Sequence, residues 1–428
     1  MTADAIPIIV HQHAEDAAFY WRQFQDNALS SQFRPIDLDA IGKLADGNLE
    51  GLRVNGDVGW ERALAELERW GGAAEAFVCT ALAFDAMERR DHSRWQRLRA
   101  AADGGECERG MHAACAWLDL APIRASLEAW LDTETGLERA IALSALASHR
   151  RDAGAALASQ FDHRDARVRA AAALHAGRLR REDARGPLAA LLDDPETAVR
   201  REAAYALGLL QDPRAPLALE GLVEPTSALP DPLLALWAVI TPRDQVRERI
   251  ADWLTRADTQ ANAVQAARYS GDPYWLPRLV EAAAAPGLGG LAADVFCHLT
   301  GAAPERDALF PRDPVRVPAH DHDHDADDAP EPADRDSNEE ELVFGWDLPV
   351  LDVDALAVWL HAHGNDLIAQ ERLILGQPAH ADYALALLND ANQAARHHAA
   401  LVLAATGAGA LFDVTLPLRR QRQALTPR

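Results

Sequence analysis

The chain has 428 residues, of which 49% are hydrophobic and 25% are charged. This length exceeds the ~250–300 residues at which one hydrophobic core stops growing, so a single compact domain is excluded, and the hydrophobic content excludes a disordered chain. The 42 basic and 66 acidic residues give a formal net charge of −24, which disfavours generic attraction to nucleic acid or to an anionic membrane.

Residues 1–120 are predicted to be helical without a clean repeat. Helices are expected near 12–28, 59–70 and 73–90. This part is interpreted as an N-terminal cap followed by degenerate repeats, because the terminal units of a repeat array must present a polar outer face. No basic segment precedes Arg22, and no apolar stretch approaches the ~20 residues of a membrane span. Neither a secretory signal nor a membrane helix is therefore expected, and the chain is predicted to be cytoplasmic.

Residues 121–301 contain an internal repeat. Residues 161–179 align with residues 192–210 at an offset of 31, so that Val168 matches Val199 and Gly177 matches Gly208. Small or apolar residues recur at helical spacing in each copy, and alanine predominates at the expected contacts. Two short antiparallel helices in each unit of about 31 residues predict an all-α HEAT-type solenoid, a right-handed superhelix of antiparallel helix pairs.

Prolines mark the same period. Each of four prolines opens an apolar helical run, at separations close to multiples of 30 residues: Pro122, Pro187, Pro216 and Pro277. Proline is tolerated at the beginning of a helix because the first backbone N–H groups have no intrahelical acceptor. These positions are predicted to be helix starts.

Residues 302–349 interrupt the helical pattern with an acidic, low-complexity insert. It is predicted to be a disordered loop, because a charged, proline-containing segment cannot bury a core. His320, His322 and His324 alternate with aspartates there and offer ligands for Zn²⁺, Ni²⁺ or Cu²⁺, but a flexible segment holds no rigid ligand set, so solubility is the favoured role. Residues 350–428 return to helix and end in an arginine-rich tail.

The string from Asp194 to Gly208 resembles the short HEAT repeat of the phycobilin-lyase type. Beyond the repeats, the whole chain resembles an uncharacterised bacterial HEAT-repeat family. The resembling stretches are 11–21, 51–64, 271–281, 296–301, the acidic insert, 373–378 and 419–425. Members of that family are often encoded beside type VI secretion genes. The resemblance thus implies a helical solenoid and a partner in that secretion apparatus.

Catalytic motifs are absent from the sequence. There is no G-x-S-x-G elbow, P-loop or H-E-x-x-H, and the four cysteines form no C-x-x-C pair. Cys79 and Cys115 lie in apolar helical surroundings and are predicted to be buried packing residues. His11 and Glu15 share a helix face but make a weak metal site alone, and the adjacent His397 and His398 cannot aim at one ion. The protein is predicted not to be an enzyme and to need no metal, cofactor or small-molecule substrate.

Arginines concentrate between residues 150 and 201, a stretch that contains 11 arginines and 8 acidic residues. Four lie near the starts of repeat helices and are the candidate partner-binding residues: Arg167, Arg169, Arg200 and Arg201. In one interpretation they pair with acidic residues of neighbouring repeats, such as Asp165 and Glu196. In the other they form a basic stripe on one face for an acidic partner segment or nucleic acid, although the net charge makes nucleic acid the less favoured ligand.

Taken together, these patterns predict a non-catalytic cytoplasmic scaffold or adaptor that presents a curved surface to a protein partner. By resemblance, that partner is a component or effector of a type VI secretion system. The alternative is a HEAT-repeat enzyme or ligand binder, either similar to bilin lyases or acting on nucleic acid through the arginine-rich groove.

Overall fold

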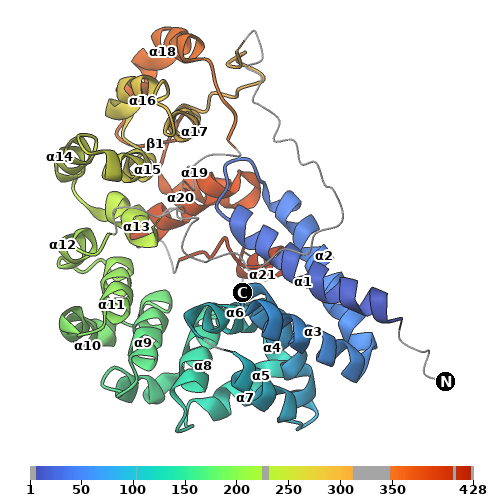
Figure 1. Cartoon of the computed structure of the whole chain (residues 1–428). Coiled ribbons are helices and arrows are strands. Elements are labelled where there is room, and N and C mark those ends of the chain that lie inside the picture. Colours follow the sequence, from blue (N-terminus) through green and yellow to red (C-terminus); the bar gives the residue numbers. More distant parts are fainter. Residues whose placement is uncertain (1–5, 103, 224–230, 312–347, 408–410, 426–428) are drawn as a thin grey trace. The chain divides into compact units, whose positions relative to one another are not determined.

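The computed structural model describes residues 6–102, 104–223, 231–311, 348–407 and 411–425. The chain forms two compact units: Met1–Leu222 together with His380–Arg428, called unit 1, and Val223–Ala379, called unit 2. The acidic segment 319–341, with its three histidines, lies outside the described residues. Figure 1 shows that the described chain is built almost entirely of helices, so the predicted all-α class is confirmed.

Unit 1 begins with six helices. They are α1 (Pro7–Asn27), α2 (Pro35–Val54), α3 (Gly56–Trp70), α4 (Ala73–Glu88), α5 (Ser93–Ala101) and α6 (Gly104–Trp117). Helix α4 is buried on nearly all sides, and an aromatic cluster joins it to its neighbours: Phe77 stacks on Trp21 of α1, and the Phe77 ring meets Trp117 of α6 edge-on. Helix α1 starts five residues earlier than predicted, because Pro7 occupies its first turn.

The repeats of unit 1 follow as helix pairs. Their elements are α7 (Leu120–Trp130), α8 (Gly136–Ser148), η1 (Gly154–Gln160), α9 (Ala166–Arg178), η2 (Glu182–Ala184), α10 (Arg185–Ala190), η3 (Leu191–Asp193), α11 (Thr197–Leu209) and α12 (Ala215–Glu220). The second helices of successive pairs, α8, α9 and α11, pack side by side. Their buried faces are rich in alanine, which lets the helix axes approach closely.

Unit 2 continues the same pattern of short helices. It contains α13 (Pro232–Ile240), α14 (Arg243–Trp253), η4 (Ala257–Thr259), α15 (Gln260–Ser270), η5 (Pro273–Trp275), α16 (Leu276–Ala282), α17 (Gly289–Thr300) and α18 (Val353–Ile368). The four predicted helix-opening prolines all lie in the first turn of a helix, in α7, α10, α12 and α16.

The backbone marks the repeat period independently of the side chains. Left-handed residues follow the second helices of five pairs, 30, 31, 60 and 30 residues apart: Arg150, Arg180, Gln211, Gly271 and Gly301. A left-handed residue just after a helix lets the backbone N–H groups that follow the helix bond to carbonyls of its last turn, and this ends the helix sharply. The period of about 30 residues is therefore present in the geometry of each unit, and the helical solenoid is confirmed.

Unit 2 also holds a feature that the sequence did not predict, a two-stranded hairpin. Strand β1 (Leu373–Ile374) pairs antiparallel with β2 (Gln377–Pro378). The turn between them donates two hydrogen bonds to α17, from Leu375 N to His298 O at 2.7 Å and from Gly376 N to Leu299 O at 2.9 Å. The hairpin therefore caps the carboxyl end of this helix.

The last helices belong to unit 1 and are α19 (Ala381–Asp390), α20 (Gln393–Ala405) and α21 (Leu418–Leu425). The arginine-rich tail of the sequence is thus mostly a helix packed on the rest of the unit. Arg419 pairs with Asp46 of α2 at 2.6 Å and donates to the Trp117 carbonyl at 2.8 Å. In the described parts of the chain, no helix combines the length and apolar character needed to cross a bilayer.

Candidate partner-binding groove

A groove of about 680 Å³ runs over the second helices of the unit 1 repeats. It is lined by residues of α6, α8, α9 and α11 and by the segment 413–417. Helix α9 shows why the sequence builds it: Arg167, Leu174 and Arg178 recur at helical spacing and face the groove, whereas Val168 and Ala172 on the other side are buried in the core. One helix thus supplies both the packing face and the groove.

The groove floor is largely apolar, and its charged rim carries both signs. Alanines of α6 and α9, together with Leu174, form the apolar part. Arg167 pairs with Asp165 and with Glu108 of α6, each at 2.7 Å, which joins α9 to α6. The hydrogen bonds that Arg167 donates to Asp165 and, to a smaller extent, to Glu108 raise the pKa of Arg167, so this guanidinium stays charged. Such a surface suits a segment that has both apolar and charged side chains.

Two titratable side chains of the groove have pKa values shifted toward the neutral form. Burial, assisted by the nearby charge of Arg167, lowers the pKa of His112 to about 4, so His112 is neutral at pH 7. Burial raises the pKa of Glu202, while Arg178 and Arg201 act in the opposite direction. Neither residue was singled out from the sequence, because only the fold reveals that these positions of α6 and α11 face one groove.

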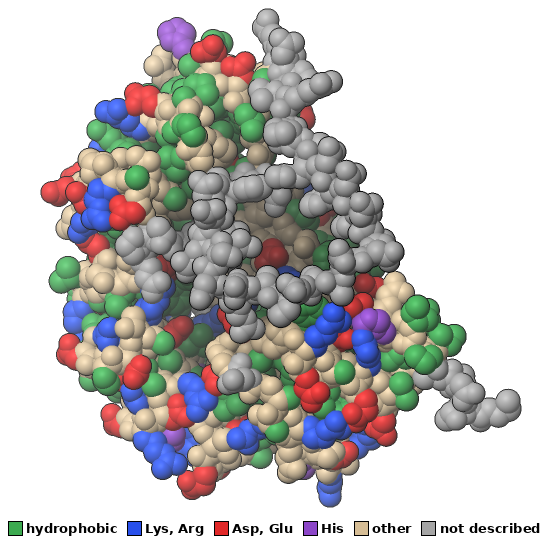
Figure 2. Space-filling model, in the orientation of Figure 1, with side chains coloured by type: hydrophobic (Ala, Val, Ile, Leu, Met, Phe, Trp, Pro, Cys, Tyr) green, Lys and Arg blue, Asp and Glu red, His purple; other side chains and the backbone are tan. Residues whose placement is uncertain are grey.

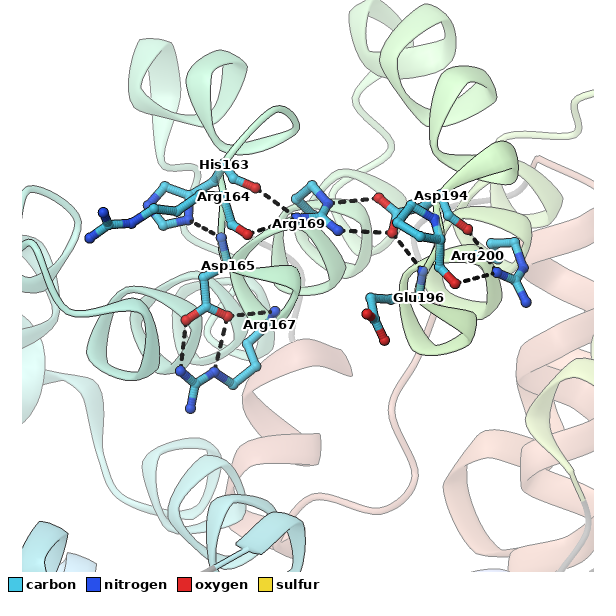
Figure 3. Close-up of polar contacts among 9 residues, drawn as sticks. His163, Arg164, Asp165, Arg167, Arg169, Asp194, Glu196 and Arg200 are labelled. Atoms are coloured by element: carbon cyan, nitrogen blue, oxygen red, sulfur yellow. Dashed lines mark hydrogen bonds and ion pairs between the residues drawn. The ribbon is translucent and has the colours of Figure 1, made fainter.

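Of the four candidate arginines, the structure places Arg167 on the groove. Arg169 points instead toward the next repeat, where it makes two hydrogen bonds to Asp194 at 2.7 and 2.9 Å (Figure 3). The side chains of Arg169 and Asp194 are only 13% and 6% exposed. This contact matches the interpretation in which arginines pair between repeats, although the acid is Asp194 rather than Glu196.

Arg200 and Arg201 donate hydrogen bonds to backbone carbonyls. Arg200 donates to the Asp194 carbonyl at 2.7 Å, just as Arg169 donates to the His163 carbonyl at 2.8 Å, so both brace the turn before their own helix (Figure 3). Arg201 donates to the Leu222 carbonyl at 2.5 Å. On the face seen in Figure 2, basic and acidic side chains are interspersed.

The pairing of Arg169 with Asp194 has counterparts in unit 2. Arg243 and Arg247 of α14 both bind Asp272, which caps η5, with contacts of 2.6 to 3.0 Å. Burial alone would raise the pKa of Asp272, but the hydrogen bonds from Arg243 and Arg247 lower it to about 2. An arginine that bonds to an aspartate about 25 residues later is therefore a recurring link between repeats.

The C-terminal segment contacts equivalent positions of successive repeats. The left-handed residues Arg150, Arg180 and Gln211 each donate a side-chain hydrogen bond to its backbone, at 2.8 to 3.0 Å. Their acceptors are the carbonyls of Leu411, Ala404 and Ala405. Asp413 then pairs with Arg178 at 3.1 Å at the edge of the groove. The end of the chain is thereby anchored along one side of the repeats.

Other candidate sites have different outcomes. His11 and Glu15 do lie together, joined by Glu66 of α3, within 4.8 Å of one another. However, Arg62 contacts both His11 and Glu66, so a guanidinium already neutralises the carboxylate that a metal ion would need.

The cysteines behave as predicted: Cys79 and Cys115 are fully buried, and burial raises the pKa of each thiol. His398 is buried in α20, whereas its neighbour His397 is half-buried.

The comparison with known families fits this geometry. The family of HEAT repeats matches residues 154–229, which span η1 to α12 and include the groove helices α9 and α11. This part of the chain is therefore similar to HEAT repeats. Neither a curated protein nor a solved structure matches the chain. HEAT repeats commonly serve as protein-interaction scaffolds, and here the matched segment supplies the groove-lining residues of α9 and α11.

Proposed function

We propose that the protein is a non-catalytic scaffold that binds a segment of a protein partner in the groove of unit 1. The observation that supports this most directly is the groove itself, about 680 Å³ with an apolar floor and a rim that includes Arg109 and Arg167. Stacked helical repeats create extended binding surfaces of this kind without a catalytic pocket. A partner segment would bury the apolar floor and satisfy the charged rim.

The chain's own end indicates what such a segment would look like. Four residues of the non-helical segment 413–417 line the groove: Asp413 is paired to Arg178, Thr415 is polar, and Leu416 and Pro417 supply apolar surface. We infer that the partner offers an extended stretch with an acidic residue close to aliphatic residues. Of the four arginines singled out in the sequence, Arg167 is the proposed partner contact, whereas Arg169, Arg200 and Arg201 are proposed to support the repeats.

The proposed partner is a component or effector of a type VI secretion apparatus. This rests on the resemblance of the chain to a bacterial family encoded beside such genes. The alternatives, a bilin-lyase-like enzyme or a nucleic-acid binder, gain no support from the groove. Nucleic acid would need a continuous basic surface, but here arginines alternate with carboxylates.

The proposal can be tested by affinity purification from cells that naturally produce the protein. Three tagged proteins are compared: the unaltered protein, a groove variant and a control variant. The Arg109→Ala/Arg167→Ala variant should lose a partner that the unaltered protein retains. Arg124→Ala is the matched control, because Arg124 is exposed on α7, pairs only with Glu128 in the described chain and does not line the groove. Equal recovery of the partner with the groove variant and the control would contradict binding in the groove.

A further inference from the structure

A separate pocket of about 370 Å³ lies at the N-terminal end of unit 1. It is bounded by one face of α1, by the end of α3 and by the start of α4. Its floor is made by Ala14 and Ala18, which are buried and too small to fill the space. It is also lined by two exposed aromatic residues, Phe19 at 51% and Trp70 at 59%. Large aromatic side chains left exposed around a pocket are typical of a binding site.

Two buried carboxylates face this aromatic pocket. Glu66 and Glu75 are only 4% and 6% exposed, and both line the pocket. Glu66 is already satisfied, because it accepts a hydrogen bond from Trp70 Nε1 at 3.2 Å and forms an ion pair with Arg62 at 2.5 Å. The bond to Glu66 also fixes the indole of Trp70 in place.

Glu75 differs from Glu66, because its carboxylate is only partly hydrogen-bonded. Its Oε1 has one long contact of 3.5 Å with the exposed Arg22, and its Oε2 has no hydrogen-bond partner among the described residues. Gly72 makes room for this carboxylate, since a Cβ atom there would lie 2.4 Å from Oε2. A buried carboxylate oxygen without a partner costs free energy, and a cationic donor would recover it.

The surrounding side chains show which cation suits this place. Three carboxylates line the pocket, those of Glu15, Glu66 and Glu75, against a single lining arginine. Arg69 places its guanidinium 4.6 Å from the centre of the Trp70 ring, but it does not line the pocket. A planar guanidinium can stack on aromatic rings and bind a carboxylate with two parallel hydrogen bonds, which an ammonium group cannot do.

We propose that this pocket binds an arginine side chain of a protein partner, with the guanidinium between Phe19 and Trp70 and hydrogen-bonded to Glu75. The site is distinct from the groove and does not depend on it, since the two share no lining residue. A basic partner also agrees with the net charge of −24, which favours its approach.

The test follows the Trp70 indole N–H signal by nitrogen–proton NMR of the full chain, assigned with the Trp70→Phe variant. The probe is the peptide acetyl-Gly-Arg-Gly-amide, and its citrulline analogue has the same shape without the charge. The arginine peptide should shift the signal in a saturable manner, with a dissociation constant on the order of 1 mM. The citrulline peptide should bind about tenfold or more weakly.

Variants locate the effect. Glu75→Gln and Phe19→Ala should each weaken binding of the arginine peptide by about threefold to tenfold. The matched control is Glu68→Gln, because Glu68 is exposed on α3 and does not line the pocket. Phe19 lies on the surface of α1, so Phe19→Ala remains informative if Glu75→Gln fails to fold. Equal shifts with the citrulline peptide, unchanged binding in both variants, or tighter binding of free L-arginine or of the matching lysine peptide would each overturn the proposal.

Discussion

Arg169 and Asp194 belong to consecutive repeats and are joined by two parallel hydrogen bonds of 2.7 and 2.9 Å. The same Arg169 donates to the His163 carbonyl and so also fastens the turn that precedes its own helix. Asp194 in turn accepts from the backbone N–H of Glu196 at 2.9 Å, and the hydrogen bond from Arg169 lowers the pKa of this carboxyl group. The Arg169 side chain therefore links two consecutive repeats and the turns that precede their second helices.

Replacing Arg169 by alanine should destabilise unit 1 without altering its helices. The change leaves the buried Asp194 carboxylate without its charged partner, which we expect to reduce the free energy of unfolding by about 1–3 kcal/mol. Arg124→Ala, which removes an exposed pair within one helix, should cost less than about 0.5 kcal/mol. Urea denaturation followed by circular dichroism measures both, and equal midpoints for the two variants would disprove a structural role for Arg169.

Gly301 should not tolerate a side chain. Its φ is 71°, and a Cβ atom would lie 2.5 Å from the carbonyl oxygen of Leu375 in the hairpin that caps α17. We expect Gly301→Ala to lower the free energy of unfolding by about 1–3 kcal/mol through backbone strain and loss of the capping contact.

Gly186→Ala is the matched control for this substitution. Gly186 lies in α10, and a Cβ atom there meets nothing within 4 Å. That variant should be neutral or stabilised by up to about 1 kcal/mol. Thermal unfolding of both proteins decides the matter, and a Gly301→Ala melting temperature equal to that of Gly186→Ala would contradict the close approach of the hairpin.

Stability should fall as the pH drops from about 6.5 to 4, in part because of His149. Burial, and then the charge of Arg420, lowers the pKa of His149 to about 4. The unfolded chain binds a proton at its ordinary pKa of about 6.5. Above pH 6.5 both states are neutral and no stability is lost. Between pH 6.5 and 4 only the unfolded state is protonated, so unfolding becomes easier.

The measurement for His149 compares urea midpoints at pH 7.5 and pH 5 in two variants. His149→Gln should lose less stability over this range than the unaltered protein, whereas His92→Gln, at an exposed position, should lose as much. The same pH dependence in all three proteins would show that His149 does not contribute to it.

Arg396 should be essential for anchoring the C-terminal helices. It is fully buried and donates to the Leu388 carbonyl at 2.9 Å, to Gln393 at 2.7 Å and to Gln421 at 2.5 Å, which links α19, α20 and α21. Arg396→Ala leaves these acceptors unpaired, and we expect a loss of about 2–4 kcal/mol. Limited proteolysis should then release the C-terminal segment before the repeats are cut. Equal cleavage rates in the variant and the unaltered protein would contradict this role.

The repeats could be predicted from the sequence because their signals are local. Val168 and Val199 hold the same place in helices that differ by one repeat, and both are fully buried as their spacing requires. The prolines that open helices are equally local signals.

Helix α2 was not predicted, since Gly42, Gly47 and Gly51 lower its intrinsic helix propensity. Packing against α1 compensates: a Cβ at Gly51 would lie within 2.6 Å of the His13 ring.

The sites could not be predicted, because they depend on contacts between distant parts of the chain. Arg180 reaches the carbonyl of Ala404, 224 residues away, and no periodic pattern connects these two positions. The aromatic pocket likewise joins Phe19 of α1 to Trp70 of α3, and only the packing of the first helices brings both to one pocket with Glu75. Sequence spacing shows which residues share a helix face but not which faces meet across a groove.

The central claim, that a protein partner lies in the groove of unit 1, is tested most directly by site-specific photo-crosslinking in cells that naturally produce the protein. A benzophenone amino acid is placed at Ala198, which is exposed and lines the groove, or at Ala190, which is exposed on α10 and does not. The account predicts one defined crosslinked protein with the probe at Ala198 and none at Ala190. Absence of a crosslink at Ala198, or the same products at both positions, would contradict it.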